Sequence, residues 1–155
     1  LIMERRVAPP GTPDLEETLD ALVGEGTSSR GIFKSKQKAL MFAAALGYRG
    51  GTRVPLEKRG EPIRFSVFQG ALDDGFVNSL AVSETGDLKT LSDDRDDERI
   101  KIFEEYAHAG LIELKRILDR PGDPLDQLLA LVIDAKEAPA GPTGPATDLA
   151  KLLGV

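Results

Sequence analysis

Apolar residues recur at helical spacing in several separate segments of the chain. The longest such stripe runs through residues 96–119 and consists of Ile100, Phe103, Ala107, Leu111, Leu114 and Leu118. Residues three and four positions apart lie on one face of a helix, so this segment is predicted to be the longest helix. Basic residues near its end and the following Pro121-Gly122 are typical of a helix C-terminus.

A second segment is apolar on nearly every side. Ser35, a typical N-cap residue, precedes a helix-forming run in which residues 39–46 are all apolar, and Gly47 follows them. A helix without a polar face is normally surrounded by other elements. We therefore predict that this central helix packs against the long helix. The side chains expected to be largely buried in that contact are Phe42, Leu46, Phe103 and Leu111.

Three further segments repeat apolar residues at helical spacing, beginning at Asp14, at Asp73 or Asp74, and at Asp123-Pro124. In the last of them, the face predicted to enter the core consists of Leu125, Leu128, Leu129, Val132 and Ile133. The stretch 62–68 is ambiguous, because its apolar residues alternate like a strand and also recur like a helix. Pro62 at a first helical position favours a short helix.

These elements predict an all-α fold, a compact single-domain bundle of five to six helices with a basic loop. The helical domain is expected to cover residues 14–135. Residues 1–13 contain three prolines and a glycine, which disfavour regular structure and predict a flexible N-terminal arm. Residues 136–155 are rich in Pro, Ala and Gly and are predicted to form a flexible tail.

Composition narrows the range of functions. With 155 residues, of which 41% are hydrophobic, the chain suits one core. It has no cysteine, which excludes disulfides and thiolate catalysis, and His108 is the only histidine, so no cofactor or His-built metal site is expected. No apolar run approaches the roughly 18–20 residues that span a bilayer, and no signal-peptide pattern opens the chain. We therefore expect a cytoplasmic protein without a membrane partner.

Charge is distributed unevenly. The formal net charge is −6, yet residues 30–64 carry nine cations against two carboxylates, a local net charge of +7. The cations predicted to form an exposed, anion-facing surface are Arg49, Arg53, Lys58, Arg59 and Arg64. Such a surface suits the phosphate backbone of DNA or an acidic protein. The alternative, left open by the sequence, is that these cations pair with the chain's own acidic elements.

Two acidic patterns could carry chemistry. The run 93–98 could bind a metal, but it lacks the glycine of a Ca²⁺ loop, so it is interpreted as a helix start matched to the helix dipole. Asp73 or Asp74, together with Asp87 and Lys89, forms a short pattern found in Mg²⁺-dependent nucleases. A small nuclease is therefore the alternative function, and a regulator-like DNA-binding helical module is a third.

Two blocks of sequence suggest a family. Residues 38–48, with the run Phe-Ala-Ala-Ala-Leu-Gly, and residues 53–63 make the first block, and Phe-Glu-Glu-Tyr-Ala-His-Ala-Gly-Leu at 103–111 makes the second. Over residues 32–133 the chain resembles the DNA phosphorothioation (Dnd)-associated protein 4 family, with His108 where the family pattern implies asparagine. The resemblance implies a role in a bacterial restriction system that acts in defence. From it we expect a non-enzymatic accessory subunit that docks on other defence-system proteins, on the phosphate backbone of duplex DNA, or on both. It transfers no catalytic residue.

Overall fold

The computed structural model describes residues 5–24, 31–69 and 73–137. Its helices are α1 (Pro13–Val23), α2 (Lys36–Gly50), α3 (Asp73–Thr85), α4 (Asp96–Leu118) and α5 (Pro124–Glu137). Three short 3₁₀ turns, η1 (Phe65–Gln69), η2 (Leu88–Leu91) and η3 (Asp93–Arg95), and two strands, β1 (Arg6–Val7) and β2 (Ile63–Arg64), complete the described elements. The all-α prediction is confirmed, since the only sheet in these ranges is this two-residue pair.

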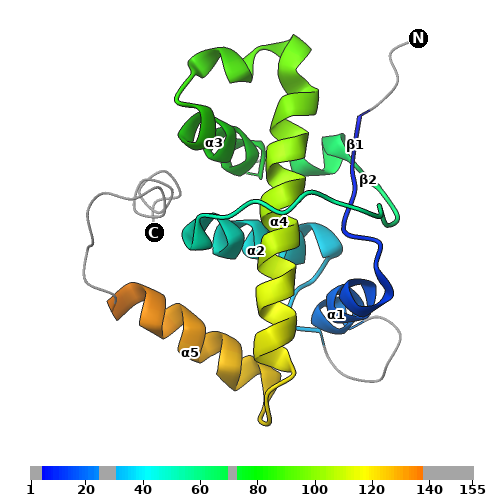
Figure 1. Cartoon of the computed structure of the whole chain (residues 1–155), viewed down its shortest axis with the longest axis vertical. Coiled ribbons are helices and arrows are strands. Elements are labelled where there is room, and N and C mark those ends of the chain that lie inside the picture. Colours follow the sequence, from blue (N-terminus) through cyan, green and yellow to red (C-terminus); the bar gives the residue numbers. More distant parts are fainter. Residues whose placement is uncertain (1–4, 25–30, 70–72, 138–155) are drawn as a thin grey trace.

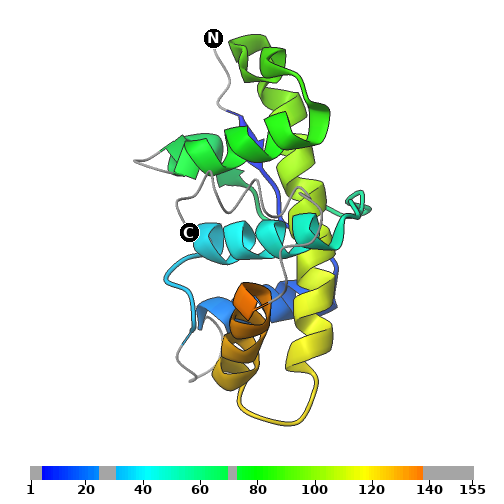
Figure 2. The ribbon, with the colours of Figure 1, turned by 90° about the vertical axis from the view of Figure 1, so that its left-hand side faces the viewer.

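The long helix α4 is the axis of the fold. Figures 1 and 2 show α3, α2 and α1 stacked along it, with α2 crossing α4 near its middle. At this crossing a Cβ on Gly110 would overlap the carbonyl oxygen of Ala43, and one on Gly47 would overlap that of Tyr106. The two backbones are therefore in direct contact. Only glycine fits at positions 47 and 110, and the small side chains of Ala43 and Ala44, which are 0% exposed, allow the same close approach along α2.

This close contact decides which apolar side chains are buried. Phe103 and Leu111 of α4 are 1% and 0% exposed, as predicted. The prediction is wrong for Phe42 and Leu46, which are only partly buried. The large residues Leu40 and Tyr48 of α2 are buried, but Phe42 and Leu46 lie toward its flanks, where Phe42 packs on the ring of Phe33 at a centroid distance of 5.4 Å.

The N-terminal segment is part of the fold rather than a flexible arm. β1 pairs antiparallel with β2, with Arg6 opposite Arg64 and Val7 opposite Ile63. Val7 is 1% exposed and Ala8 2%. The prediction is therefore wrong for residues 5–12, and residues 1–4 lie outside the described ranges. Prolines lack an N–H donor, but their extended backbone still offers carbonyl acceptors, and Pro9 accepts from the N–H of Gly60 at 2.7 Å.

The ambiguous stretch 62–68 contains both predicted structures. Ile63–Arg64 forms the strand β2, and the 3₁₀ turn η1 follows at once over Phe65–Gln69. Phe65 and Phe68 of this turn are buried, which accounts for the helical part of the pattern. The alternation of Ile63 with its neighbours reflects its place in the strand.

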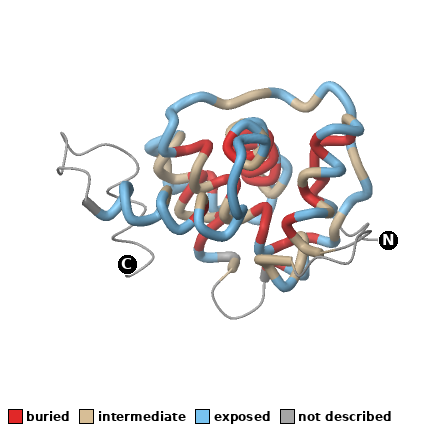
Figure 3. Tube along the Cα trace, turned by 90° about the horizontal axis from the view of Figure 1, so that it is seen from below, coloured by how far each residue is buried: buried red, intermediate tan, exposed pale blue. Residues whose placement is uncertain are grey.

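The last helix, α5, contributes little to the core. Leu128 is buried, but Leu125, Leu129, Val132 and Ile133 are 37–51% exposed, so the predicted core face is wrong for four of its five residues. Figure 3 shows this helix largely exposed as it leads toward the C-terminus. The predicted tail, residues 136–155, lies outside the described residues apart from the last two positions of α5. No helix in the described ranges is long and apolar enough to cross a membrane.

Candidate functional site

The basic loop, residues 51–62, leaves the end of α2 and crosses the face of α4 to reach β2 (Figure 1). Its middle is attached to α4 through the backbone. Val54 donates its N–H to the carbonyl oxygen of Glu105 at 3.2 Å. Nδ1 of His108 lies 3.1 Å from the carbonyl oxygens of both Val54 and Pro55. Because both partners only accept, Nδ1 carries the proton and donates it, so this histidine holds the loop in place.

Arg53 forms ion pairs with two glutamates of the same chain. Its Nε donates to Glu105 at 3.1 Å, and its terminal nitrogen donates to Glu84 on α3 at 3.1 Å. The guanidinium also lies 6.0 Å from the centre of the Tyr106 ring, whose hydroxyl donates to Glu84. Burial, followed by the neighbouring Glu84, raises the pKa of the Tyr106 hydroxyl. The side chain of Arg53 is only 28% exposed, so the prediction that it is an exposed surface cation is wrong.

Arg59 forms a two-point ion pair with Glu104. Its two terminal nitrogens lie 3.2 and 2.7 Å from the carboxylate oxygens, and the backbone N–H of Ala8 donates to the same carboxylate at 2.5 Å. Glu104 is 5% exposed. Burial raises the pKa of this carboxyl, while the Ala8 N–H and Arg59 act in the opposite direction. One carboxylate therefore joins the N-terminal segment, the loop and α4.

The five predicted site residues thus separate into two kinds. For Arg53 and Arg59, the alternative left open by the sequence is confirmed, since both pair with the chain's own acids, and the side chain of Arg59 is nevertheless 58% exposed, as predicted. Arg49, Lys58 and Arg64 are exposed, and within the described ranges Arg49 and Lys58 have no ion-pair partner. Figure 1 shows that α2 ends on one side of α4 while β2 lies on the other. Arg49 is therefore separate from the cations of the β1–β2 pair.

The nuclease pattern is not assembled. Asp73 begins α3 and pairs with Lys38 at 3.0 Å, whereas Asp87 follows the far end of that helix. Thirteen residues of helix span about 20 Å, too far for two carboxylates to share one metal. Asp87 instead caps η2 by accepting the N–H of Lys89 at 2.9 Å. The side chain of Asp74 lies outside the described residues, and within them no three acidic or histidine side chains could jointly hold a metal ion.

The acidic run is a helix start, as interpreted from the sequence. Asp93 and Asp94 lie in η3, and Asp96 and Asp97 open the first turn of α4. The buried Arg99 reaches back to the carbonyl oxygens of Thr90 and Ser92 and to the carboxylate of Asp96, which ties η2 to α4. This pairing gives the run a structural role.

Sequence reasoning missed the acidic partners of the loop. Glu104 and Glu105 occur among apolar residues in the middle of the long helix, where a carboxylate is rarely left without a cation. The position of these two glutamates among apolar residues was the sequence signal for a buried ion pair. It could not identify Arg53 or Arg59 as the cations, because the pairs are separated by 52 and 45 positions in the chain.

The fold and this surface define a small helical domain in which charged side chains fasten a basic loop across a central helix. The chain matches the family of DNA sulphur modification system-associated protein 4 over residues 12–152 and belongs to that family. The same matched range includes the loop and the Glu-Glu-Tyr-Ala-His block that holds it. Neither the curated proteins nor the solved structures gave a significant match to the chain.

Proposed function

We propose that this protein is a non-enzymatic accessory subunit of a bacterial DNA phosphorothioation-linked restriction system, acting in defence against phage by docking on other proteins of that system. The family membership supports the association with DNA sulphur modification. The charged side chains of the blocks 53–63 and 103–111 support a non-catalytic role, because Arg53, Arg59, Glu104 and Glu105 are occupied by one another.

The observation that carries the docking role is the apolar face of α5. Leu125, Leu129 and Ile133 are each about half exposed and follow one another at four-residue intervals, on one side of the helix. Val132 adds to the same face. A contiguous apolar strip of this kind is typical of a protein–protein contact, whereas single exposed apolar residues are ordinary.

The test is direct binding to each purified protein encoded beside this chain in its phosphorothioation gene cluster, measured by calorimetry. We expect one of them to bind the wild type and to lose at least about tenfold in affinity to Leu129→Asp/Ile133→Asp. The control is Leu88→Asp, because Leu88 is 73% exposed and lies on η2, away from α5. Equal loss in both variants, or no binding partner in the cluster, contradicts the docking role.

A second candidate function is contact with the phosphate backbone of DNA. The observation that favours it is the β1–β2 pair, where Arg6 lies directly opposite Arg64. Two exposed cations at opposite positions place positive charge side by side on this strand pair, an arrangement that suits contact with a phosphate. Lys58 lies beside the same segment, since its carbonyl oxygen accepts the N–H of Gly11 at 2.7 Å.

This candidate is tested by a salt titration of duplex binding. If each cation meets one phosphate, Arg6→Ala/Lys58→Ala/Arg64→Ala should flatten the slope of log affinity against log salt by about 2–3 units. The matched control is Lys115→Ala/Arg116→Ala/Arg120→Ala, which removes the same charge at the far end of α4 and should retain the slope. Equal slopes in the two triple variants, or no binding by the wild type at low salt, reject DNA contact.

A further inference from the structure

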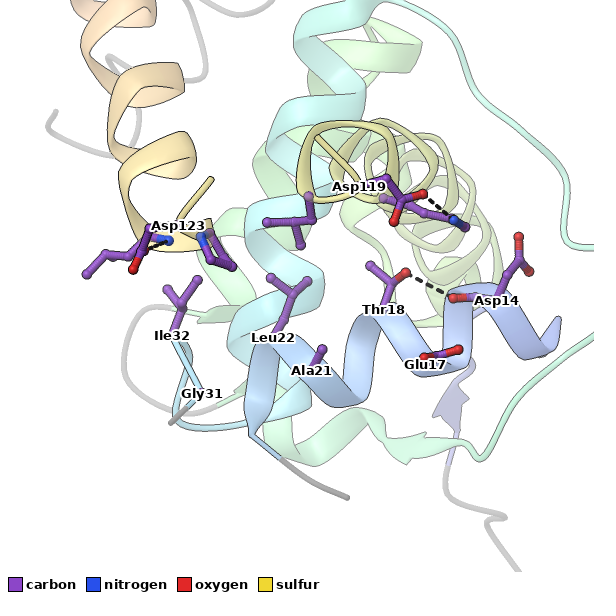
Figure 4. A pocket seen from close by; sticks show the side chains of 13 residues that line it. Asp14, Glu17, Thr18, Ala21, Leu22, Gly31, Ile32, Asp119 and Asp123 are labelled. Atoms are coloured by element: carbon purple, nitrogen blue, oxygen red, sulfur yellow. Dashed lines mark hydrogen bonds and ion pairs between the residues drawn. The ribbon is translucent and has the colours of Figure 1, made fainter. Parts of the chain in front are cut away.

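A groove lies between α1, the end of α4 and the start of α5 (Figure 4). Its volume is about 790 Å³. The floor is apolar and is formed by Ala21, Leu22, Ile32, Leu118, Pro124 and Leu125. Leu22 is 1% exposed, so the groove reaches down to the core.

The rim of the groove is acidic. Asp14 and Glu17 of α1 line one side, and Asp119 and Asp123 lie between α4 and α5. Lys115 is the single cation among the lining residues, and it pairs with Asp119 at 2.5 Å. The pKa of Lys115 is raised by Asp119 and, more weakly, by Asp14 and Glu17. Four carboxylates against one ammonium leave the rim negatively charged.

The groove is continuous with the apolar face of α5. Leu125 belongs to both, because it lines the groove and is 49% exposed. From there Leu129, Val132 and Ile133 extend the apolar strip along a helix of 14 residues, or about 21 Å. Asp126 on the same helix is exposed as well. The combined surface is an apolar track of roughly helix length with carboxylates beside it.

We propose that this groove and the α5 strip bind a basic amphipathic helix of a partner protein, with its apolar side on the track and its Lys and Arg side chains on the acidic rim. The inference rests on the proposed docking role and gives the partner's chemistry. An amphipathic helix in an apolar groove is a common mode of peptide recognition, and opposite charges at the rim set its orientation and speed its association.

The charge of the rim also argues against the other occupants. In a symmetric dimer the same surface patch meets itself, so the acidic rim formed by Asp14, Glu17, Asp119 and Asp123 would be brought against a patch of the same negative charge. The chain's own residues 138–155 carry one acid and one lysine, and so they have no net charge to match the rim. Nucleic acid is excluded by its negative charge.

The probe is a labelled 14-residue peptide of leucine and lysine, with leucines at helical spacing on one face, measured by fluorescence anisotropy against the full chain. We expect saturable binding that weakens as salt rises. A scrambled peptide of the same composition should bind at least about tenfold more weakly, because it keeps the charge but lacks the apolar face. Equal binding of the two peptides would overturn the proposal, since charge alone would then explain it.

Two variants separate the rim from the track. Asp14→Asn/Glu17→Gln/Asp119→Asn/Asp123→Asn should weaken the peptide about tenfold or more and remove most of its salt dependence. Asn at position 123 can still cap α5, as Asp123 does through the N–H of Leu125 at 2.8 Å, so the fold is retained. Leu125→Asp/Leu129→Asp should abolish binding, and Leu88→Asp should not change it. An unchanged affinity in the rim variant overturns the proposal.

Other outcomes identify other occupants and reject a basic helix. Peptide binding that appears only after residues 138–155 are removed would assign the groove to the chain's own end. A concentration-dependent dimer that Leu129→Asp/Ile133→Asp dissociates would assign it to a second copy. A protein encoded in the gene cluster could bind the wild type and the rim variant but not the track variant. In that case the docking role holds while the basic-helix inference fails.

Discussion

The side chain of Glu104 connects the N-terminal segment and the basic loop to α4. It is buried on α4, and it accepts from the Ala8 N–H and from both terminal nitrogens of Arg59. Truncation of such a residue would leave a buried donor and a cation without their acceptor. The residue is therefore a structural junction, although its raised pKa and charged neighbours are features that also occur at catalytic carboxylates.

The raised pKa of Glu104 gives a pH dependence of unusual sign. The folded protein holds this proton more tightly than the unfolded chain, whose carboxyl titrates near the ordinary value of 4.5. The contribution of Glu104 to the free energy of unfolding should therefore fall as pH rises from that value through the folded pKa. Urea unfolding of the wild type and Glu104→Gln between pH 4 and 7 measures it, because Gln cannot ionise: the stability of the wild type should fall relative to that of the variant as pH rises.

Glu113 is the matched control for that experiment. Its hydrogen bond to Arg116 lowers the pKa of its carboxyl, so its contribution is present above the ordinary value and is lost as pH falls through the folded pKa. The difference between the wild type and Glu113→Gln should thus shrink toward low pH. The same sign for both glutamates would show that the Glu104 site is not desolvated as described.

At the scale of elements, the sequence predicted correctly those helices whose boundaries depend on residues close by in the chain. α4 was expected over residues 96–119 and occupies Asp96–Leu118, because its apolar stripe and acidic first turn lie within the segment and its stop signal at Pro121 follows directly after it. α2 follows the same logic, with Ser35 capping it through the N–H of Lys38. These features need no distant partner.

The elements that were predicted wrongly depend on distant partners. The strand β1 exists because residues 63–64 are beside it, and the loop is fastened by Glu84, Glu104 and Glu105. Apolar periodicity on α5 was sound as helix evidence, yet it could not tell whether the chain or another molecule covers that face. The candidate surface was predicted incompletely for the same reason. The positive charge of the loop was evident from the sequence, but the carboxylates that pair with it were not.

The exposure of α5 predicts a difference in local stability. Only Leu128 of its apolar residues is buried, whereas α4 is buried along most of its length. Amide hydrogens of α5 should therefore exchange with solvent much faster than those of α4, by local opening. Hydrogen exchange followed by mass spectrometry measures this, and Leu128→Ala should remove the remaining protection while Leu129→Ala leaves it unchanged. Protection equal to that of α4 would mean that the α5 face is covered in solution.

At the scale of the whole molecule, the N-terminal segment closes the fold. Deletion of residues 1–11 removes the buried Val7 and the Ala8 N–H that Glu104 accepts. Burial of one valine and one hydrogen bond to a buried carboxylate together stabilise by about 3–5 kcal/mol, so the deletion should lower the free energy of unfolding by that amount. Urea unfolding measures it, with Arg6→Ala as the control because Arg6 is exposed. A loss below about 1 kcal/mol would contradict the packing described.

Charge is also organised across the whole molecule. The β1–β2 pair carries Arg6 and Arg64, whereas the groove beside the far end of α4 is rimmed by four carboxylates. The overall charge of −6 hides this division. The positive and the negative surface are therefore separate, so a ligand bound at one does not cover the other.

The contact between Ala8 and Glu104 also sets an order of events during synthesis. The two residues are 96 positions apart in the chain, so the donor residue, Ala8, is synthesised long before the acceptor residue, Glu104. At translation rates of about 5–20 residues per second, roughly 5–20 s pass between the synthesis of Ala8 and the synthesis of Glu104. The final place of the N-terminal segment depends on α4 and on the loop that crosses it, and so this segment is among the last parts of the molecule to become native. During that interval the strand edge of β1 and the side chain of Val7 are open to chaperones or to a partner made at the same time.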